Sequence, residues 1–271
     1  MDDTGTGTPD GREVGEGFDR AAEGYDDLLR HNREGARRLV AALPAGDYDA
    51  ILDVGCGTGF VTEEMVERFG TRRVTGVDPS EGMLERFREK LGDRVDMTLI
   101  TAGVHDMPVP DAAFDAVVSG MAFHWFPEKP AAIAAMARRV RPGGVLAVLA
   151  SAAGTDAEFR AVLEAIDPPV PESWTGVFDV IQRTGDEVAG WMRDAGLEVL
   201  DAWEERRVRR VDPDAYMARI GAVASHLSAS MDPDEAAAHI ERVVRAVHEA
   251  TGPEGFEYAF VKLFAIGRRP A

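Results

Sequence analysis

The residues best suited to chemistry lie where an apolar run gives way to closely spaced glycines. Residues 50–54 are apolar apart from Asp53, and Gly55, Gly57 and Gly59 follow at alternate positions. Apolar residues then recur at helical spacing, namely Val61, Met65, Val66 and Phe69. A strand, a glycine turn and a helix in this order place backbone N–H groups and a helix N-terminus at the carboxyl end of the strand. Glycine allows positive φ angles and the close approach of a ligand to the backbone there.

A second acid follows at a spacing that suits the same kind of site. Asp78 follows the predicted strand 73–77 and lies 19 residues beyond Gly59, as in a strand–helix–strand unit that binds a nucleotide. A carboxylate at this strand end can accept hydrogen bonds from both hydroxyls of a ribose. An Asp before Pro79 and Ser80 also fits a helix cap. The sequence favours the ribose role and leaves the cap as the alternative.

The spacing of the glycines distinguishes between two nucleotide sites. The dinucleotide pattern G-x-G-x-x-G requires its third glycine at position 60, which is Phe60. The observed D-x-G-x-G-x-G resembles motif I of the class I S-adenosylmethionine (SAM) dependent methyltransferases. Further marks of that family follow in its usual order. They are the acid at 78, the M-P-x-P…F-D segment at 107–115 and the R-P-G-G turn at 141–144.

The resemblance implies that SAM is the cofactor and that particular residues hold it. In the family the glycine loop holds the methionine part, and its acid, here Asp53, helps to hold the ammonium group. Asp78 and Pro79 then correspond to the ribose site, and Met83 to the position that packs on adenine. The other residues implied in the cofactor site are Gly55, Cys56, Gly57, Thr58, Gly59, Val104, His105, Ser119 and Gly120.

The adenine end departs from the family pattern at one position. Where the family often has an acid that accepts a hydrogen bond from the adenine amino group, this chain has Gly103. The resemblance therefore assigns adenine recognition to the backbone of Val104 and His105, or to Asp106 if the loop shifts.

Two residues are candidates for work on the methyl acceptor. The A-F-H-W-F run at 122–126 resembles the trans-aconitate methyltransferase-like branch of the type 11 methyltransferases, in which this loop meets the acceptor. His124, with an ordinary pKa near 6.5, could take a proton from a hydroxyl or orient a carboxylate. The alternative is a histidine packed in the pocket wall. Residues 18–26 resemble a family segment whose tyrosine, here Tyr25, lines the site; the alternative is a surface helix whose tyrosine only packs.

Hydrophobic periodicity predicts strands at 50–54, 73–77, 96–101, 114–120 and 145–150, with helices after the first, second and fourth of them. Beyond Ser151 it predicts one helix and a Pro-rich loop within 155–184, a helix at 186–195 and a strand at 197–203. Two amphipathic helices follow Asp212 and Asp232, and the last strand covers 256–266. The resemblance implies an α/β fold, a Rossmann-like seven-stranded sheet with its last strand antiparallel, flanked by helices.

The expected organisation is a disordered N-terminal tail at 1–16 and a methyltransferase domain at 17–271. The core of that domain is expected at about 45–204 and 255–268. A cap or lid is expected from 17–44, 155–184 and 205–254, with the late helices inserted before the last strand.

Composition limits the partners. A formal net charge of −18 opposes binding to a nucleic-acid backbone or an anionic membrane. Cys56 is the single cysteine, so an internal disulfide is excluded, and no spacing resembles a zinc or calcium site. No apolar run reaches the roughly 18 residues that a spanning helix needs. We expect a cytoplasmic protein without a metal, a nucleic-acid partner or a membrane partner.

The expected function is SAM-dependent methylation of a small-molecule acceptor, with S-adenosyl-L-homocysteine as product. The favoured acceptor atom is an oxygen, in a carboxylate or a hydroxyl. Such chemistry depends on holding the nucleophile in line with the methyl group. The alternatives are a C- or N-methyltransferase acting on a natural product, a protein or RNA methyltransferase, and a protein that binds SAM without transferring methyl. The acceptor, and the choice between monomer and homodimer, stay open.

Overall fold

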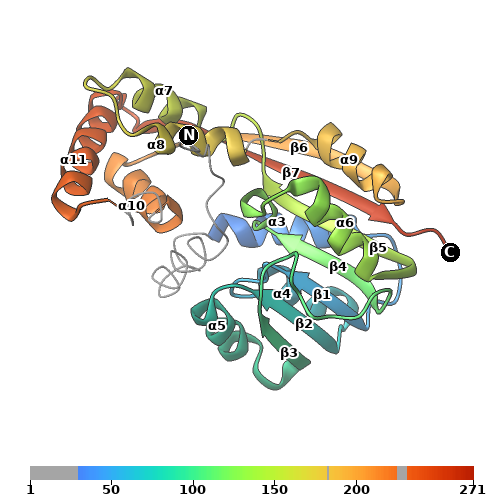
Figure 1. Cartoon of the computed structure of the whole chain (residues 1–271). Helices are drawn as coiled ribbons and strands as arrows, with labels where there is room; N and C mark the ends of the chain where they lie inside the picture. Colours follow the sequence, from blue (N-terminus) through green and yellow to red (C-terminus); the bar gives the residue numbers. More distant parts are fainter. Residues whose placement is uncertain (1–29, 182, 225–230) are drawn as a thin grey trace, which may run out of the picture.

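The computed structural model describes residues 30–181, 183–224 and 231–271, which form a seven-stranded sheet with helices on both faces (Figure 1). The predicted tail at 1–16 lies outside these residues. The strand order is β3-β2-β1-β4-β5-β7-β6. The strands are β1 (Ala50–Val54), β2 (Arg73–Asp78), β3 (Asp96–Thr101), β4 (Phe114–Gly120), β5 (Val140–Ser151), β6 (Glu198–Val211) and β7 (Phe256–Arg268).

The direction of the strands confirms the predicted fold. Strands β1 to β5 are parallel, and β7 runs antiparallel between β5 and β6. Strand β1 pairs with β2 on one side and with β4 on the other. The chain therefore leaves β1 towards one edge of the sheet and later returns to build the other half from β4. In such sheets the carboxyl ends of the two central strands border the crevice where ligands bind.

Helices cover the two faces of the sheet in two separate hydrophobic clusters. Helices α3 (Arg30–Ala42), α4 (Phe60–Phe69) and α5 (Glu81–Leu91) pack on one face, whereas α6 (Lys129–Arg139) and α9 (Gly185–Asp194) pack on the other. Alternate residues of β5 point into each cluster, as the two-residue period of a strand requires. Helix α3 is the described part of the expected cap at 17–44. It packs on the sheet face through Ala36, Leu39, Val40 and Leu43.

A third cluster lies at the end of the sheet where β7 begins. Helices α7 (Ala157–Ala165), α8 (Glu172–Ile181), α10 (Pro213–Ala224) and α11 (Pro233–Glu249) gather there (Figure 1). As predicted, Asp212 and Asp232 cap α10 and α11, each accepting from two backbone N–H groups. The shared cluster includes Phe159, Trp174, Phe178, Tyr216, Val247 and Phe256. This cluster gives the helices a hydrophobic core of their own beside the sheet.

Residues 155–184 differ from the prediction of one helix and a Pro-rich loop. They form two helices, and α8 contains Trp174 and Phe178, which were expected in the loop. These two aromatic residues lie four apart, on one side of a helix, and both are buried in the third cluster. The prolines stay outside the helix, so it can form directly after them.

Two strands, β5 and β6, are much longer than predicted. Strand β6 runs to Val211 rather than 203, because residues 204–211 pair with β7 despite their many charges. Charged side chains are common on an edge strand, which β6 is. Strand β5 begins at Val140, so the expected reversal at 141–144 lies inside it. There Gly143 takes a φ of 78° and the pairing with β4 shifts register between Phe114 and Ala116, as in a bulge.

Among the described residues, no helix is both long and apolar enough to cross a membrane.

Candidate functional site

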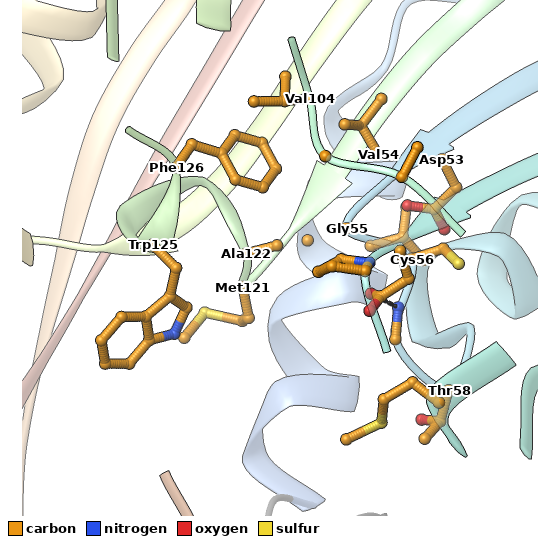
Figure 2. A pocket seen from close by; sticks show the side chains of 18 of the residues that line it. Asp53, Val54, Gly55, Cys56, Thr58, Val104, Met121, Ala122, Trp125 and Phe126 are labelled. Carbon is orange, nitrogen blue, oxygen red and sulfur yellow. Dashed lines mark hydrogen bonds between the residues drawn. The ribbon is translucent and has the colours of Figure 1, made fainter. Parts of the chain in front are cut away.

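A cavity of about 530 Å³ opens at the carboxyl ends of β1, β2 and β4 (Figure 2). Its size is that of an ordinary small-molecule site. Most of the residues that the sequence assigns to the cofactor line it, namely Asp53, Gly55, Cys56, Gly57, Thr58, Asp78, Pro79, Met83, Val104, His105 and Gly120. Gly59, Ser119 and His124 were assigned to the site as well, and they are not among the lining residues.

The glycine turn is held against the neighbouring strands. The N–H groups of Gly55 and Cys56 donate to the carbonyl of Val77 at 2.7 and 3.1 Å. Gly55 has a φ of 66°, and a Cβ added to it would lie 2.3 Å from the Cβ of Ala122, which follows β4. The loops after β1 and β4 can therefore approach each other only with glycine at this position.

The other two glycines have different surroundings. Gly57 has a φ of 50°, and a Cβ added there would meet nothing within 4 Å. The space beside its backbone is thus open towards the cavity that it lines. Gly59 has a φ of 87° and precedes α4, and a Cβ added there would lie 2.9 Å from the ring of Phe87. Gly59 serves the packing of α4 and α5 rather than the wall of the cavity.

Asp78 is tied to the glycine turn. The N–H of Gly57 donates to its Oδ2 at 2.8 Å, and the N–H of Ser80 donates to its Oδ1 at 3.0 Å. The cap of α5 is Ser80, whose Oγ accepts from the N–H of Met83 at 3.1 Å. The capping role that the sequence left open for Asp78 thus belongs to its neighbour. A carboxylate offers about four acceptor positions, so Asp78 can serve ligand hydroxyls together with the backbone.

Asp53 is almost completely buried, and its Oδ2 accepts from the hydroxyl of Thr62 at 2.7 Å. Burial raises the pKa of Asp53 to about 7, and the charge of Asp78 adds to this rise while Thr62 opposes it. A cation in the cavity would favour the ionised carboxylate. Burial also raises the pKa of the Cys56 thiol, so Cys56 is a poor nucleophile and fits its interpretation as a small wall residue.

Two buried apolar residues, Met83 and Val104, line the cavity where the sequence places the adenine. A Cβ added to Gly103 would meet nothing within 4 Å. Nε2 of His105 lies 3.2 Å from the carbonyl oxygen of Pro127, so this side chain joins the loop after β3 to the loop after β4. Asp106 lines the cavity too.

The loop after β4 supplies an apolar wall. Figure 2 shows Met121, Trp125 and Phe126 on one side of the cavity, and Asp53 and Cys56 on the other. Trp125 and Phe126 belong to the run at 122–126 that was predicted to meet the acceptor, but the residue proposed there for chemistry was His124.

His124 packs beside Trp125, with ring centres 5.2 Å apart, and does not itself line the cavity. It is 6% exposed, and its Nδ1 accepts from the N–H of Ser151 at 3.3 Å. Burial and the nearby charge of Lys129 lower the pKa of His124 to about 3. The ring is therefore neutral near pH 7, with its proton on Nε2. This geometry favours the packed-wall alternative, and a catalytic role for His124 stays a prediction. Tyr25, the other candidate, lies outside the described residues.

The predicted cap at 17–44 includes α3, but no residue of α3 was assigned to the site. Asn32 and Ala36 of this helix line the cavity. The signal was present in the helical spacing, because Asn32 is the polar member of an otherwise apolar row that continues through Ala36, Leu39, Val40 and Leu43.

Comparison with known sequences identifies relatives of the chain. The family described as "Methyltransferase domain" matches residues 51–144. A malonyl-[acyl-carrier protein] O-methyltransferase of Geobacter sulfurreducens is 30% identical over 221 residues, which cover 79% of this chain and 82% of that protein. An enzyme of the same name from Methylococcus capsulatus is 35% identical over 162 residues, 59% of each chain. The chain thus spans under two thirds of the length of some of the curated relatives it matches.

Solved structures share the fold at low sequence identity. A methyltransferase-like protein of Bacillus halodurans superposes with a TM-score of 0.60 at 18% identity, covering 91% of this chain and all of the other. The [4+2]-cyclase SpnF superposes with a TM-score of 0.62 at 19% identity, covering 97% and 98% of the two chains. These likenesses concern the fold alone.

Proposed function

The chain belongs to the class I SAM-dependent methyltransferases, and from this we propose that it transfers a methyl group from SAM to an oxygen atom of a small-molecule acceptor. The observation that carries the proposal is the convergence of the glycine turn and Asp78 on one cavity at the carboxyl ends of β1 and β2. The open space beside Gly57 fits a ligand that approaches the backbone closely.

We assign the two ends of the cofactor to the residues at each end of this cavity. Asp78 accepts hydrogen bonds from the ribose hydroxyls, and Met83 and Val104 pack on the adenine. Asp53, once ionised, holds the ammonium group of the methionine part. SAM supplies a methyl group that its sulfonium makes electrophilic. The apolar wall of Met121, Trp125 and Phe126 keeps water from the reacting atoms.

A carboxylate is the acceptor group that agrees best with this wall. A carboxylate is ionised near pH 7 and needs no base to become a nucleophile, whereas a hydroxyl does. His124 is neutral, has its Nδ1 engaged and does not line the cavity. The relatives are named for a malonyl group carried on acyl-carrier protein. We therefore propose a malonyl-type carboxylate in thioester linkage as the acceptor.

The surroundings of the site complete the proposal. Helices α7, α8, α10 and α11, with their own hydrophobic cluster, act as a lid over the acceptor. The enzyme works in the cytoplasm, as a monomer or a homodimer, without a metal and without a nucleic-acid partner.

Calorimetric titration with S-adenosylhomocysteine, with NAD as control, tests the cofactor. We expect binding of the first ligand only, and binding of NAD alone would overturn the assignment of the glycine turn. Methyl-labelled SAM then tests the acceptor, with malonyl-acyl-carrier protein compared against acetyl-acyl-carrier protein, which lacks the free carboxylate. We expect a base-labile labelled ester from the malonyl form only. Equal labelling of both forms, or of neither, would rule out the carboxylate.

A further inference from the structure

A buried polar group on α3 has no hydrogen-bond partner among the described residues. Asn32 is 4% exposed, and its side-chain Oδ1 is one of the buried atoms left unpaired in this part of the chain. An unpaired buried acceptor costs roughly 1–3 kcal/mol, so proteins rarely keep one without a reason. Asn32 lines the cavity together with Asp53 and Gly55. The side chain thus borders the space in which we place the cofactor.

Asn32 is held in this position by the packing of α3. Arg33 pairs with Glu63 at 2.9 Å, and these residues join α3 to α4, the helix that begins at the glycine turn. Gly35 brings α3 close to β5, since a Cβ added there would lie 3.0 Å from Cδ2 of Leu149. Helix α3 is therefore fixed against the two elements that border the cavity on this side.

The order of the strands indicates which part of the ligand lies near Asn32. A side-chain carbonyl oxygen needs a donor, and SAM offers the adenine amino group, the ribose hydroxyls and the ammonium group. Of the residues proposed for adenine and ribose, Asp78 ends β2, and Met83 and Val104 follow β2 and β3, on one side of β1. Helix α3 packs on β4 and β5, on the other side of β1. Of the three donors of SAM, the ammonium group is therefore the one that can lie on the β4 side of β1, near α3.

We infer that Asn32 is a second binding residue for the methionyl end of the cofactor, with its Oδ1 accepting a hydrogen bond from the ammonium group beside Asp53. The inference rests on the proposed SAM site. A neutral amide suits this place, because Asp53 and Asp78 already repel each other electrostatically. Asn32 adds an acceptor without a third negative charge, and it discriminates in favour of ligands that carry an amino-acid end.

The test compares two ligands that differ only at that end. S-adenosylhomocysteine carries the ammonium group, and 5′-methylthioadenosine keeps the adenine and ribose but lacks the amino-acid part. Both are titrated calorimetrically into the full chain and into Asn32→Leu, which keeps a similar volume and removes the acceptor. We expect Asn32→Leu to bind S-adenosylhomocysteine about tenfold more weakly, as for loss of a hydrogen bond to a charged group. Binding of 5′-methylthioadenosine should change less than about twofold.

Two further variants distinguish a binding role of Asn32 from a purely structural one. Asn32→Gln keeps a neutral amide acceptor and should retain S-adenosylhomocysteine affinity within about threefold of the wild type, and a loss as large as that of Asn32→Leu would contradict the inference. Ser151→Ala removes another buried unpaired oxygen, one that does not line the cavity, and should leave both affinities unchanged. Equal losses for both ligands in Asn32→Leu would reduce Asn32 to a structural residue and overturn the inference. Unchanged affinity for S-adenosylhomocysteine would overturn it too, whereas a wild type that fails to bind this ligand would defeat the proposed function itself.

Discussion

Two buried aspartates follow strands of the same sheet, yet their surroundings differ. Asp78, at the end of β2, accepts from the backbone N–H groups of Gly57 and Ser80 and lines the cavity. Asp156, shortly after β5, accepts from the hydroxyl of Tyr216 at 2.9 Å and from Arg219 at 2.5 Å, and it does not line the cavity. Both residues are 8% exposed.

The difference supports the binding role proposed for Asp78 and indicates a structural role for Asp156. Gly57 of the glycine turn and Ser80 donate backbone N–H groups to Asp78, and these hold its carboxylate at the wall of the cavity. The partners of Asp156 are side chains of α10, and the guanidinium of Arg219 lies 4.8 Å from the ring centres of both Tyr216 and Tyr258. Asp156 therefore attaches the helical region to the sheet. We expect its loss to affect stability, and the loss of Asp78 to affect binding.

Replacing Asp156 should have the largest effect. Asp156→Ala leaves Arg219 buried without its counter-charge, which typically costs about 3–5 kcal/mol of unfolding free energy. Urea denaturation measures this loss, and calorimetry at a temperature where the variant is folded should show S-adenosylhomocysteine affinity within about threefold of wild type. The double variant Asp156→Leu/Arg219→Met removes both charges and should recover most of the stability. A loss below about 1 kcal/mol in the single variant would contradict the structural role.

Replacing Asp78 tests the binding role that we propose for this residue. Asp78→Ala removes the acceptor for two hydroxyls and should weaken S-adenosylhomocysteine binding by about a hundredfold, as expected for two hydrogen bonds to a charged group. The matched control is Ser80→Ala, which removes the cap of α5 and should cost about 1 kcal/mol of stability with little change in affinity. If the two variants lost affinity equally, Asp78 would act through the scaffold and not on the ribose.

The cofactor region could be predicted from the sequence because local rules determine it. The bounds of β1, β3 and β4 follow from apolar runs interrupted by glycine or charge, and positive φ angles explain the glycines at 55, 57 and 59. The ribose role proposed for Asp78 was predicted from its distance along the chain beyond Gly59. Asn32 could have been found as a polar residue on an apolar helix face, but only the fold shows that this face borders the cavity.

The helical region could be predicted only in outline, since its contacts join distant residues. Asp156 and Arg219 are separated by 63 positions, and no local pattern links them. The extension of β6 depends on pairing with β7, which overrides the charged sequence at 204–210. His124 illustrates the same limit. Its place beside a family motif suggested chemistry, whereas the buried N–H of Ser151 that engages its Nδ1 is visible only in three dimensions.

The pH dependence of binding sharpens the assignment of Asp53. Its pKa of about 7 in the ligand-free protein means that the carboxyl group is largely protonated at pH 6. An ammonium group binds the ionised form, so S-adenosylhomocysteine affinity should rise about tenfold from pH 6 to pH 8. Calorimetry across this range measures it, and Asp53→Asn should give a flat profile. A wild-type affinity independent of pH would contradict the assignment.

The stability of the ligand-free protein should show the opposite trend. The folded pKa of Asp53 lies above the unfolded value of about 3.9. Its contribution to stability is therefore complete below about pH 4 and is lost as the pH rises through about 7. Urea denaturation at pH 5 and pH 8 measures this change in unfolding free energy, and Asp53→Asn should lack the part that comes from Asp53.

The smallest expected effect is a gain in S-adenosylhomocysteine affinity from a new side chain at the adenine end of the cavity. Gly103 stands where the family often has an acid, and a side chain there would meet nothing within 4 Å. Gly103→Asp should therefore fold normally and offer an acceptor to the adenine amino group, which would tighten S-adenosylhomocysteine binding by about threefold. Gly103→Ala, which adds only the methyl group, should leave the affinity unchanged, and S-inosylhomocysteine, whose base lacks the amino group, should not gain. Equal gains for both ligands in Gly103→Asp would show that the new charge acts on the loop rather than on adenine. The proposal that adenine lies beside Gly103 would then be wrong.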